Sequence, residues 1–294
     1  QGGVQIGPGE YIMPDPVLVG RNAAKLKHLC KISGVEKMTT NLDEALAIAG
    51  KAGIPGQNLL MADKKGRIAW RLTAQIPNRT GDCDKTKPRD PAKACTWQGW
   101  LPGSRNPALI DPASGRLWTA NARTVEGNDL ELVGDGGYAF GARAKQIRDS
   151  LFAKSRFTER DLLAIQTDNR ALFLQRWRQL LESSAAASPR DSALRQLLAA
   201  DPSWDGVASP ESVSYRLTRA WRLQVNRRIE EMLLAPAIEK LGKDAKPGPN
   251  GFDYEAPGFA GFEDVAWAML QAKPAHLLTR DYRNWPALLE SAAV

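Results

Sequence analysis

Asn121 is the residue whose type and position first suggest chemistry. It follows a short strand predicted over residues 117–119 in the segment SGRLWTANAR, residues 114–123. A side-chain amide fixed at the end of a strand can donate a hydrogen bond to the oxyanion that forms during acyl transfer. Asparagine is also a common turn residue that hydrogen-bonds its own backbone. The local sequence leaves both interpretations open.

Two tryptophans, Trp70 and Trp118, lie on predicted strands in the same half of the chain. Their rings could line a pocket for an acyl group, because aromatic side chains supply large apolar surfaces. An aromatic side chain on a strand also commonly belongs to the core. Both residues are therefore substrate-binding candidates, with core packing as the alternative.

The cysteines indicate a compartment. Cys83 and Cys95 bracket the polar loop CDKTKPRDPAKAC, and a disulfide between them would close a loop that little else holds. Such a bridge implies an oxidising environment, so we predict a periplasmic or secreted protein, with two unpaired thiols as the alternative. Cys30 is interpreted as a small buried hydrophobe. His28 and His276 form no cluster with metal-ligand spacing, which argues against a zinc site.

The composition is that of a globular protein with room for a large core. The 294 residues are 43% hydrophobic and 25% charged, and no apolar run approaches the roughly 20 residues of a membrane helix. The net charge of +7 permits nucleic-acid binding, but basic and acidic residues alternate along predicted helices and no nucleic-acid-binding motif occurs. We therefore expect neither a nucleic-acid partner nor a membrane span. The chain begins at Gln1 without a secretory signal, which suggests a processed chain or an excised piece.

Strands dominate the elements predicted for residues 1–140. Asn41 is placed to cap a short helix that Gly50 or Gly53 ends. Two apolar runs around DKKG, within residues 57–77, predict a β-hairpin whose second run alternates and therefore has one buried face. A hairpin and one further strand make no stable sheet alone, so we expect this chain either to supply part of a larger sheet or to complete it nearer the N-terminus.

Helices dominate residues 141–294. Thr158 and Asp161 predict a capping box that starts one long helix over residues 159–183. Near the end of the chain, the spacing predicts two short helices. The sequence thus predicts an α+β protein with a β-rich first segment and a helical second segment that divide near residue 140.

Proline marks the limits of the helices between these points. Two Ser-Pro pairs, at Ser188 and Ser209, each predict an N-cap followed by proline at the first helical position. Pro236 should kink or end the second of these helices, because proline removes a backbone donor and clashes with the preceding turn.

Seven stretches, in order and with plausible spacing, resemble one family, the penicillin-acylase-type N-terminal nucleophile amidohydrolases. They are GIPGQNLLMADKKGRIAWRLTAQIPNR, WQGWLP, NPALIDPASGRLWTANAR, GARAKQIRDSL, DLLAIQTDNRALFL, PSWDG and KPAHLLTRDYRNWPALL, and they cover roughly residues 40–290. The resemblance implies a four-layer αββα fold, of which this chain supplies strands from its first half and helices from its second.

The resemblance also implies a mechanism. In that family a precursor cuts itself so that a serine becomes the first residue of the β-chain, and its hydroxyl attacks an amide carbonyl with its own α-amine as base. Asn121 would donate to the oxyanion, and Arg143 would lie near the active site, although an exposed helix arginine is the alternative. The serine is absent, because Gln1 has no hydroxyl and no Ser-Asn-x-Trp occurs. Ala122 stands where a second asparagine is usual. This piece alone should be catalytically inactive.

The resemblance also implies partners and leaves a metal site and a second function open. The implied partners are the rest of the β-chain, an α-chain from the same precursor, and a small-molecule amide: the acyl side chain of a β-lactam, an N-acyl homoserine lactone or a lipopeptide. No cofactor is required. Asp129 and Glu131 stand where some relatives place a calcium-ligating carboxylate, but calcium needs six or more oxygens, so a solvated pair is the alternative. A non-catalytic binding or scaffold module with the family's fold remains the competing interpretation.

Overall fold

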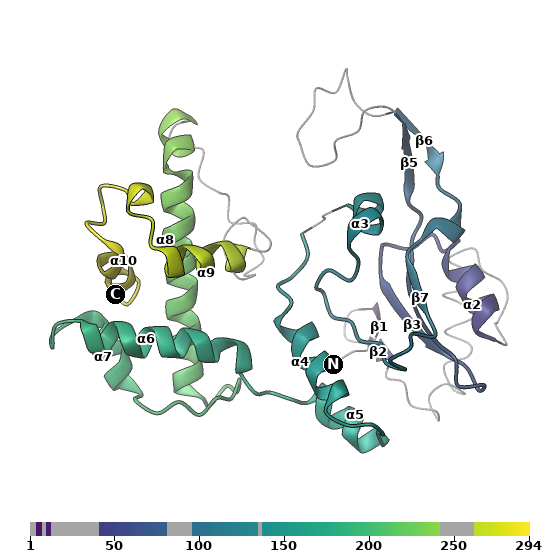
Figure 1. The fold of residues 1–294 in the computed structure, drawn as a ribbon, viewed down its shortest axis with the longest axis horizontal. Helices are drawn as coiled ribbons and strands as arrows, with labels where there is room; N and C mark the ends of the chain where they lie inside the picture. The colour runs from purple at the N-terminus through teal and green to yellow at the C-terminus, as the bar shows by residue number, and fades with distance from the viewer. Residues whose placement is uncertain (1–3, 8–9, 13–40, 81–95, 135–136, 242–261) are drawn as a thin grey trace. The chain divides into compact units, whose positions relative to one another are not determined.

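The computed structural model describes residues 4–7, 10–12, 41–80, 96–134, 137–241 and 262–294 (Figure 1). The chain divides into two compact units. The first comprises Gln1–Gly136 with Ile147–Gln166, and the second comprises Gly137–Gln146 with Thr167–Val294. All the named strands lie in the first unit and the second is helical, so the α+β class is confirmed. The division of the sequence near residue 140 stays a prediction.

The first unit is built on a three-stranded antiparallel sheet in the order β3–β4–β7. β3 and β4 form the predicted hairpin, and β7 pairs with the other edge of β4, so that Leu60 and Leu109 lie on either side of Trp70. Two further pairs join β1 to β2 and β5 to β6. The strands are β1 (Val4–Gly7), β2 (Glu10–Ile12), β3 (Asn58–Ala62), β4 (Ile68–Leu72), β5 (Pro77–Thr80), β6 (Thr96–Trp100) and β7 (Ala108–Ile110).

The central strand β4 is buried on both faces, so the prediction of one buried face was wrong. Ala69 packs against Leu42 and Leu46 of helix α2 (Leu42–Ala49), which covers one face. Arg71 shares that face and donates a hydrogen bond from Nη2 to the carbonyl of Gly103. Trp70 points to the opposite face and is also buried. The alternating pattern missed this because a guanidinium with a backbone acceptor is buried where a solvated charge was expected.

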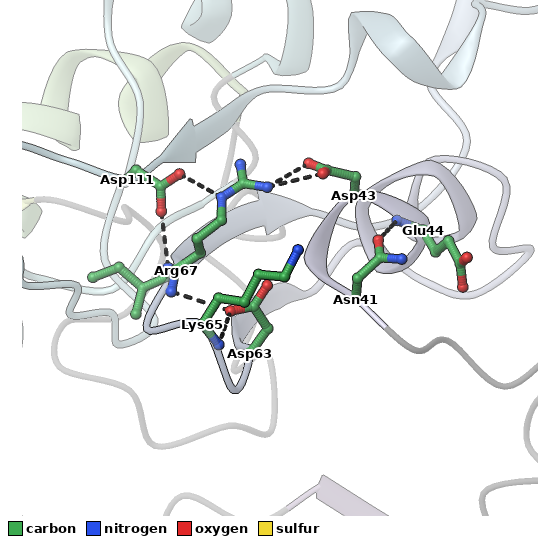
Figure 2. A network of polar contacts seen from close by, with 8 residues as sticks. Asn41, Asp43, Glu44, Asp63, Lys65, Arg67 and Asp111 are labelled. Carbon is green, nitrogen blue, oxygen red and sulfur yellow. Dashed lines mark hydrogen bonds and ion pairs between the residues drawn. The ribbon is translucent and has the colours of Figure 1, made fainter.

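Arg67, after the hairpin turn, ties the sheet to α2 (Figure 2). Its Nη1 lies 2.8 Å from Asp43 Oδ2 on α2, and its Nε lies 2.9 Å from Asp111 Oδ2, next to β7. The hydrogen bond from Arg67 lowers the pKa of Asp111. The half-buried Arg67 guanidinium thus joins α2 to the residue that follows β7.

Helix α2 begins and ends as the sequence predicts. The side chain of Asn41 accepts a hydrogen bond from the backbone N–H of Glu44 at 3.0 Å (Figure 2), and the helix ends at Gly50. Gly50 also meets Gly103 backbone to backbone, so a Cβ at either position would collide with the other residue. Glycine is therefore required here for close approach, independently of its role in ending the helix.

The helices account for most of the remaining described residues. Those following α2 are α3 (Gly127–Val133), α4 (Ala142–Phe152), α5 (Glu159–Gln166), α6 (Gln175–Ala187), α7 (Ala193–Ala200), α8 (Val213–Leu241), α9 (Phe262–Ala272) and α10 (Trp285–Ser291). The core of the second unit is formed by α6, α7, α8, α9 and α10. The two short helices predicted near the end of the chain are confirmed as α9 and α10.

The single long helix predicted over residues 159–183 is wrong, because it breaks after α5. The capping box that starts it is confirmed, with the N–H of Thr158 donating to Asp161 Oδ2 at 3.0 Å and the N–H of Asp161 donating to Thr158 Oγ1 at 3.2 Å. Asp168 then accepts from the backbone N–H of Arg170 at 3.1 Å and from its guanidinium at 2.7 Å. This local side-chain pairing competes with helical backbone bonds and turns the chain before α6.

Both Ser-Pro pairs predict their helices too early. The cap of α7 is Ser192 and that of α8 is Ser212, whose hydroxyls accept from the N–H three residues further on at 3.3 and 3.1 Å. Each Ser-Pro pair lies in the turn that precedes its helix. In the first turn the N–H of Ser192 donates to the carbonyl of Pro189, and in the second the N–H of Ser212 donates to the carbonyl of Ser209, both at 3.2 Å. Helix α8 also continues past Pro236, which does not end it.

Candidate functional site

Asn121 lies at an exposed bend in the first unit. The strand predicted just before it was wrong, because residues 116–120 form no strand and β7 takes the third place in the sheet. Arg116 instead holds this segment against the end of α4: its Nε donates to the carbonyl of Leu151 at 2.7 Å and its Nη2 to the carbonyl of Lys154 at 2.6 Å. Side-chain contacts, rather than a strand ladder, fix the approach to Asn121.

The carbonyl directly before Asn121 is held by a residue that the sequence gave no reason to select. Asn58, the first residue of β3, donates from Nδ2 to the carbonyl of Ala120 at 3.3 Å. Its Oδ1 accepts from the indole N–H of Trp70 at 2.8 Å. The hydroxyl of Thr119 donates to the same Ala120 carbonyl at 3.2 Å. Two donors thus restrain the peptide that leads into Asn121.

The residue after Asn121 is restrained as well, because Ala122 is only 8% exposed. Asn121 itself is exposed and makes further contacts of its own. The backbone is therefore fixed on both sides of a side chain that solvent can reach. An amide donor on a fixed backbone has the chemistry needed to stabilise a developing negative charge.

The two tryptophans have different surroundings. Trp70 is 7% exposed on the central strand and its indole nitrogen is satisfied by Asn58, which places it in the core. Trp118 is half-buried and contacts Phe152 of α4 edge to face, with ring centroids 5.7 Å apart. A substrate-binding role stays a prediction for both.

Arg143 is the second residue of α4 and is exposed. It belongs to the second compact unit, whereas Asn121 belongs to the first. Its role near an active site stays a prediction. Cys83, Cys95 and Cys30 lie outside the described residues, as does Gln1, so the predicted disulfide stays a prediction too.

Asp129 and Glu131 both lie on helix α3. Both are exposed, and residues two apart on a helix do not face each other. Across the ranges that the structure describes, no three His, Cys, Asp or Glu residues gather closely enough to hold a metal ion. These two carboxylates do not by themselves form the shell of six or more oxygens that calcium requires.

A second polar cluster, centred on Glu263 of α9, lies in the second unit. Glu263 Oε1 accepts from the indole N–H of Trp177 at 2.7 Å and from Arg176 Nη2 at 2.9 Å. Oε2 accepts from Arg222 Nε at 2.9 Å and from Asn226 Nδ2 at 3.0 Å. These partners are 37 to 87 residues away in sequence, so no local pattern indicates them.

The Glu263 cluster is buried and electrostatically strong. Burial alone would raise the pKa of Glu263, but the charge of Arg222 and the donated hydrogen bonds hold that pKa below its usual value. The Glu263 side chain and the Arg222 side chain are each 3% exposed. A substrate could not reach this carboxylate, so we interpret the cluster as packing of α6, α8 and α9 rather than as a reactive site.

Comparison with known proteins decides the family. The family model described as penicillin amidase matches residues 31–292, which is most of the chain. The chain belongs to the penicillin amidase family. This confirms the relationship that the seven sequence stretches indicated.

Two curated acylases are relatives of this chain. Penicillin acylase 2 proenzyme from Pseudomonas sp. strain SE83 is 29% identical over 177 residues, which is 60% of this chain and 22% of that protein. Acyl-homoserine lactone acylase QuiP from Pseudomonas aeruginosa is 24% identical over 235 residues, covering 76% of this chain and 26% of that protein. The chain thus spans about a quarter of the length of the curated relatives it matches.

A solved structure of the family shares the fold. Thermostable penicillin G acylase from Alcaligenes faecalis is 20% identical, with a TM-score of 0.55 over 87% of this chain and 48% of that chain. The expected Ntn-hydrolase fold is therefore confirmed.

In the part of this penicillin amidase family member that the structure describes, no helix is both long and apolar enough to cross a membrane.

Proposed function

We propose that this chain is part of an amidohydrolase that cleaves a linear amide through an acyl-enzyme, with Asn121 donating to the oxyanion. The observation that carries the proposal is an exposed asparagine amide whose backbone is restrained on both sides, by the held carbonyl of Ala120 and by buried Ala122. The family membership supports the reaction class. The nucleophile is the N-terminal serine of the mature β-chain, which lies outside this sequence.

The reaction has two stages. The serine hydroxyl attacks the amide carbonyl, and the α-amine of the same serine takes its proton. The carbonyl oxygen becomes an oxyanion, to which the amide of Asn121 donates a hydrogen bond. Collapse of this intermediate breaks the C–N bond, and the proton passes to the departing amine. Water then hydrolyses the ester and regenerates the serine.

The relatives suggest the class of substrate. One is called a penicillin acylase and another an acyl-homoserine lactone acylase, so the proposed substrates are a β-lactam with an acyl side chain and an N-acyl homoserine lactone. We further propose an α-chain from the same precursor as partner, a place for Arg143 near the site, and a periplasmic or secreted location with Cys83 and Cys95 bridged. The name of the first relative, a proenzyme, supports processing.

The test is intact mass and N-terminal sequencing of the natural gene product, with hydrolysis assays on a penicillin and an N-acyl homoserine lactone. A mature chain that begins with serine and releases the free amine from either substrate supports the proposal. An unprocessed chain, or one that begins with an inert residue and hydrolyses neither substrate, favours a binding or scaffold module that keeps the fold.

A further inference from the structure

The link between Asn58 and Asn121 joins residues far apart in sequence. The hydrogen bond from Asn58 to the Ala120 carbonyl connects positions 62 residues apart, and the bond to Trp70 connects β3 to β4. The first bond ends at the carbonyl of Ala120, the residue directly before Asn121, which is the proposed oxyanion donor. Asn58 therefore connects the core of the sheet to the backbone that carries the reactive amide.

The two partners of Asn58 require opposite hydrogen-bonding roles from its side chain. The indole of Trp70 can only donate a hydrogen bond, and the carbonyl of Ala120 can only accept one. A single side chain that serves both must present an acceptor to Trp70 and a donor to Ala120. Asparagine does this in one orientation, whereas aspartate would keep the acceptor and lose the donor.

The restrained carbonyl fixes more than its own position. The peptide between Ala120 and Asn121 is planar, so the direction of the Ala120 carbonyl sets the direction of the Asn121 N–H and the position of its Cα. Asn58 and Thr119 both donate to that oxygen, which leaves this peptide little rotational freedom. A rotation of the peptide would displace the Asn121 amide from its place in the site.

We propose that Asn58 is a positioning residue for the acyl-transfer reaction, acting through the Ala120 carbonyl to orient Asn121. This inference rests on the proposed function, because it requires Asn121 to serve the oxyanion. The proposal predicts an effect on kcat rather than on KM. Asn58 acts on the peptide that precedes Asn121 rather than on the substrate.

The first test is Asn58→Asp in the full-length enzyme, assayed on whichever of the two substrates, a penicillin or an N-acyl homoserine lactone, the wild-type enzyme hydrolyses. We expect kcat to fall by about 10- to 100-fold, the size of effect that a misplaced catalytic group produces, with KM nearly unchanged. Thr119→Val removes the second donor to the same carbonyl and should lower kcat in the same direction, by a smaller factor. Together the two variants keep the test decisive if either folds poorly.

The matched control is Asn106→Asp. Asn106 is buried in the same unit, and its amide nitrogen Nδ2 donates to the carbonyls of Leu72 and Ala74 at 3.0 and 2.7 Å, away from Ala120. This change loses the same kind of amide-to-carbonyl bond elsewhere. It should lower Tm at least as much as Asn58→Asp and leave kcat of the folded enzyme unchanged.

The decisive measurement is the double variant with Asn121→Ala. If Asn58 acts through Asn121, then Asn58→Asp should lower kcat in the wild-type background and have almost no further effect once Asn121 is alanine. An equal effect in both backgrounds, or none in either, would overturn the positioning role while leaving the proposed function intact. If Asn121→Ala alone leaves kcat unchanged, the oxyanion assignment itself fails, and the positioning role fails with it.

Discussion

The two units each contain a polar cluster, and the clusters differ in charge and in exposure. In the first unit, hydrogen bonds link the neutral groups of Trp70, Asn58 and Ala120, and this series ends next to the exposed side chain of Asn121. In the second unit, charged groups surround Glu263 and every oxygen is enclosed. The first cluster presents a group to solvent, whereas the second joins three helices to one another.

This difference shows that electrostatic strength does not by itself identify a reactive site. Charges and burial affect Glu263 more strongly, yet both of its carboxylate oxygens accept hydrogen bonds from within the fold and a substrate cannot contact it. The hydrogen bonds of Asn58 involve no charged group, but they direct the peptide between Ala120 and Asn121. A site for acyl transfer needs accurately directed donors that a substrate can reach, and of these two clusters only the first lies next to one.

The largest effect on stability is expected from Glu263→Ala. Removing the carboxylate leaves Arg222 buried without its counter-charge, so the free energy of unfolding should fall by about 3–5 kcal/mol. Chemical denaturation measures this. The control Glu231→Ala removes an ion pair with Arg227 in which the two side chains are 50% and 56% exposed, and it should cost far less. Equal losses for both variants would contradict the structural role of the Glu263 cluster.

Glu230 of α8 tests the opposite case, a buried carboxylate without donors. Both of its oxygens lack a hydrogen-bond partner within the described part of the chain, and burial raises its pKa to about 7. The folded protein then keeps a proton that the unfolded chain releases near pH 4.5. Stability should therefore fall as the pH rises from about 4.5 to 7 and stay level above that.

The corresponding variant is Glu230→Gln. It should abolish that fall and raise the free energy of unfolding above pH 7 by something on the order of 2 kcal/mol, as followed by denaturation between pH 5 and 8. Glu231→Gln, at the exposed neighbouring position, serves as control and should change the profile little. An unchanged pH profile in Glu230→Gln would show that this carboxyl does not titrate with a raised pKa.

The smallest effect is expected from Arg67→Gln, which removes the guanidinium between Asp43 and Asp111 (Figure 2). Its ion pairs with Asp43 and Asp111 are reachable by solvent and are therefore screened by salt. Tm should fall slightly at low ionic strength, the difference should shrink in 1 M salt, and kcat should not change. Lys64→Gln, in the same turn, controls for the loss of charge. A salt-independent loss in Arg67→Gln would indicate a packing role instead.

Local patterns predicted the elements whose causes are local. The hairpin, the Asn41 cap and the capping box at Thr158 each depend on residues within a few positions, and all three are confirmed. The Ser-Pro helices failed although a signal was present. A second serine follows each pair in SPRDS and SPES, and that serine caps the helix.

Long-range contacts account for the remaining failures. The strand expected over residues 117–119 is absent because Arg116 binds carbonyls 35 and 38 residues away. Asn58 reads in the sequence as the polar start of an apolar run, and its partners 12 and 62 residues away appear only in the fold. The candidate Asn121 was found from the sequence, but the residues that hold it were not.

The most direct test of the central claim is the acylation rate of Asn121→Ala in the full-length enzyme, measured under single-turnover conditions. Loss of one oxyanion donor predicts a rate about 10²- to 10³-fold lower, with Tm nearly unchanged because the side chain is exposed. An acylation rate close to that of the wild type would contradict the account, and Asn121 would then be a turn residue without a catalytic role.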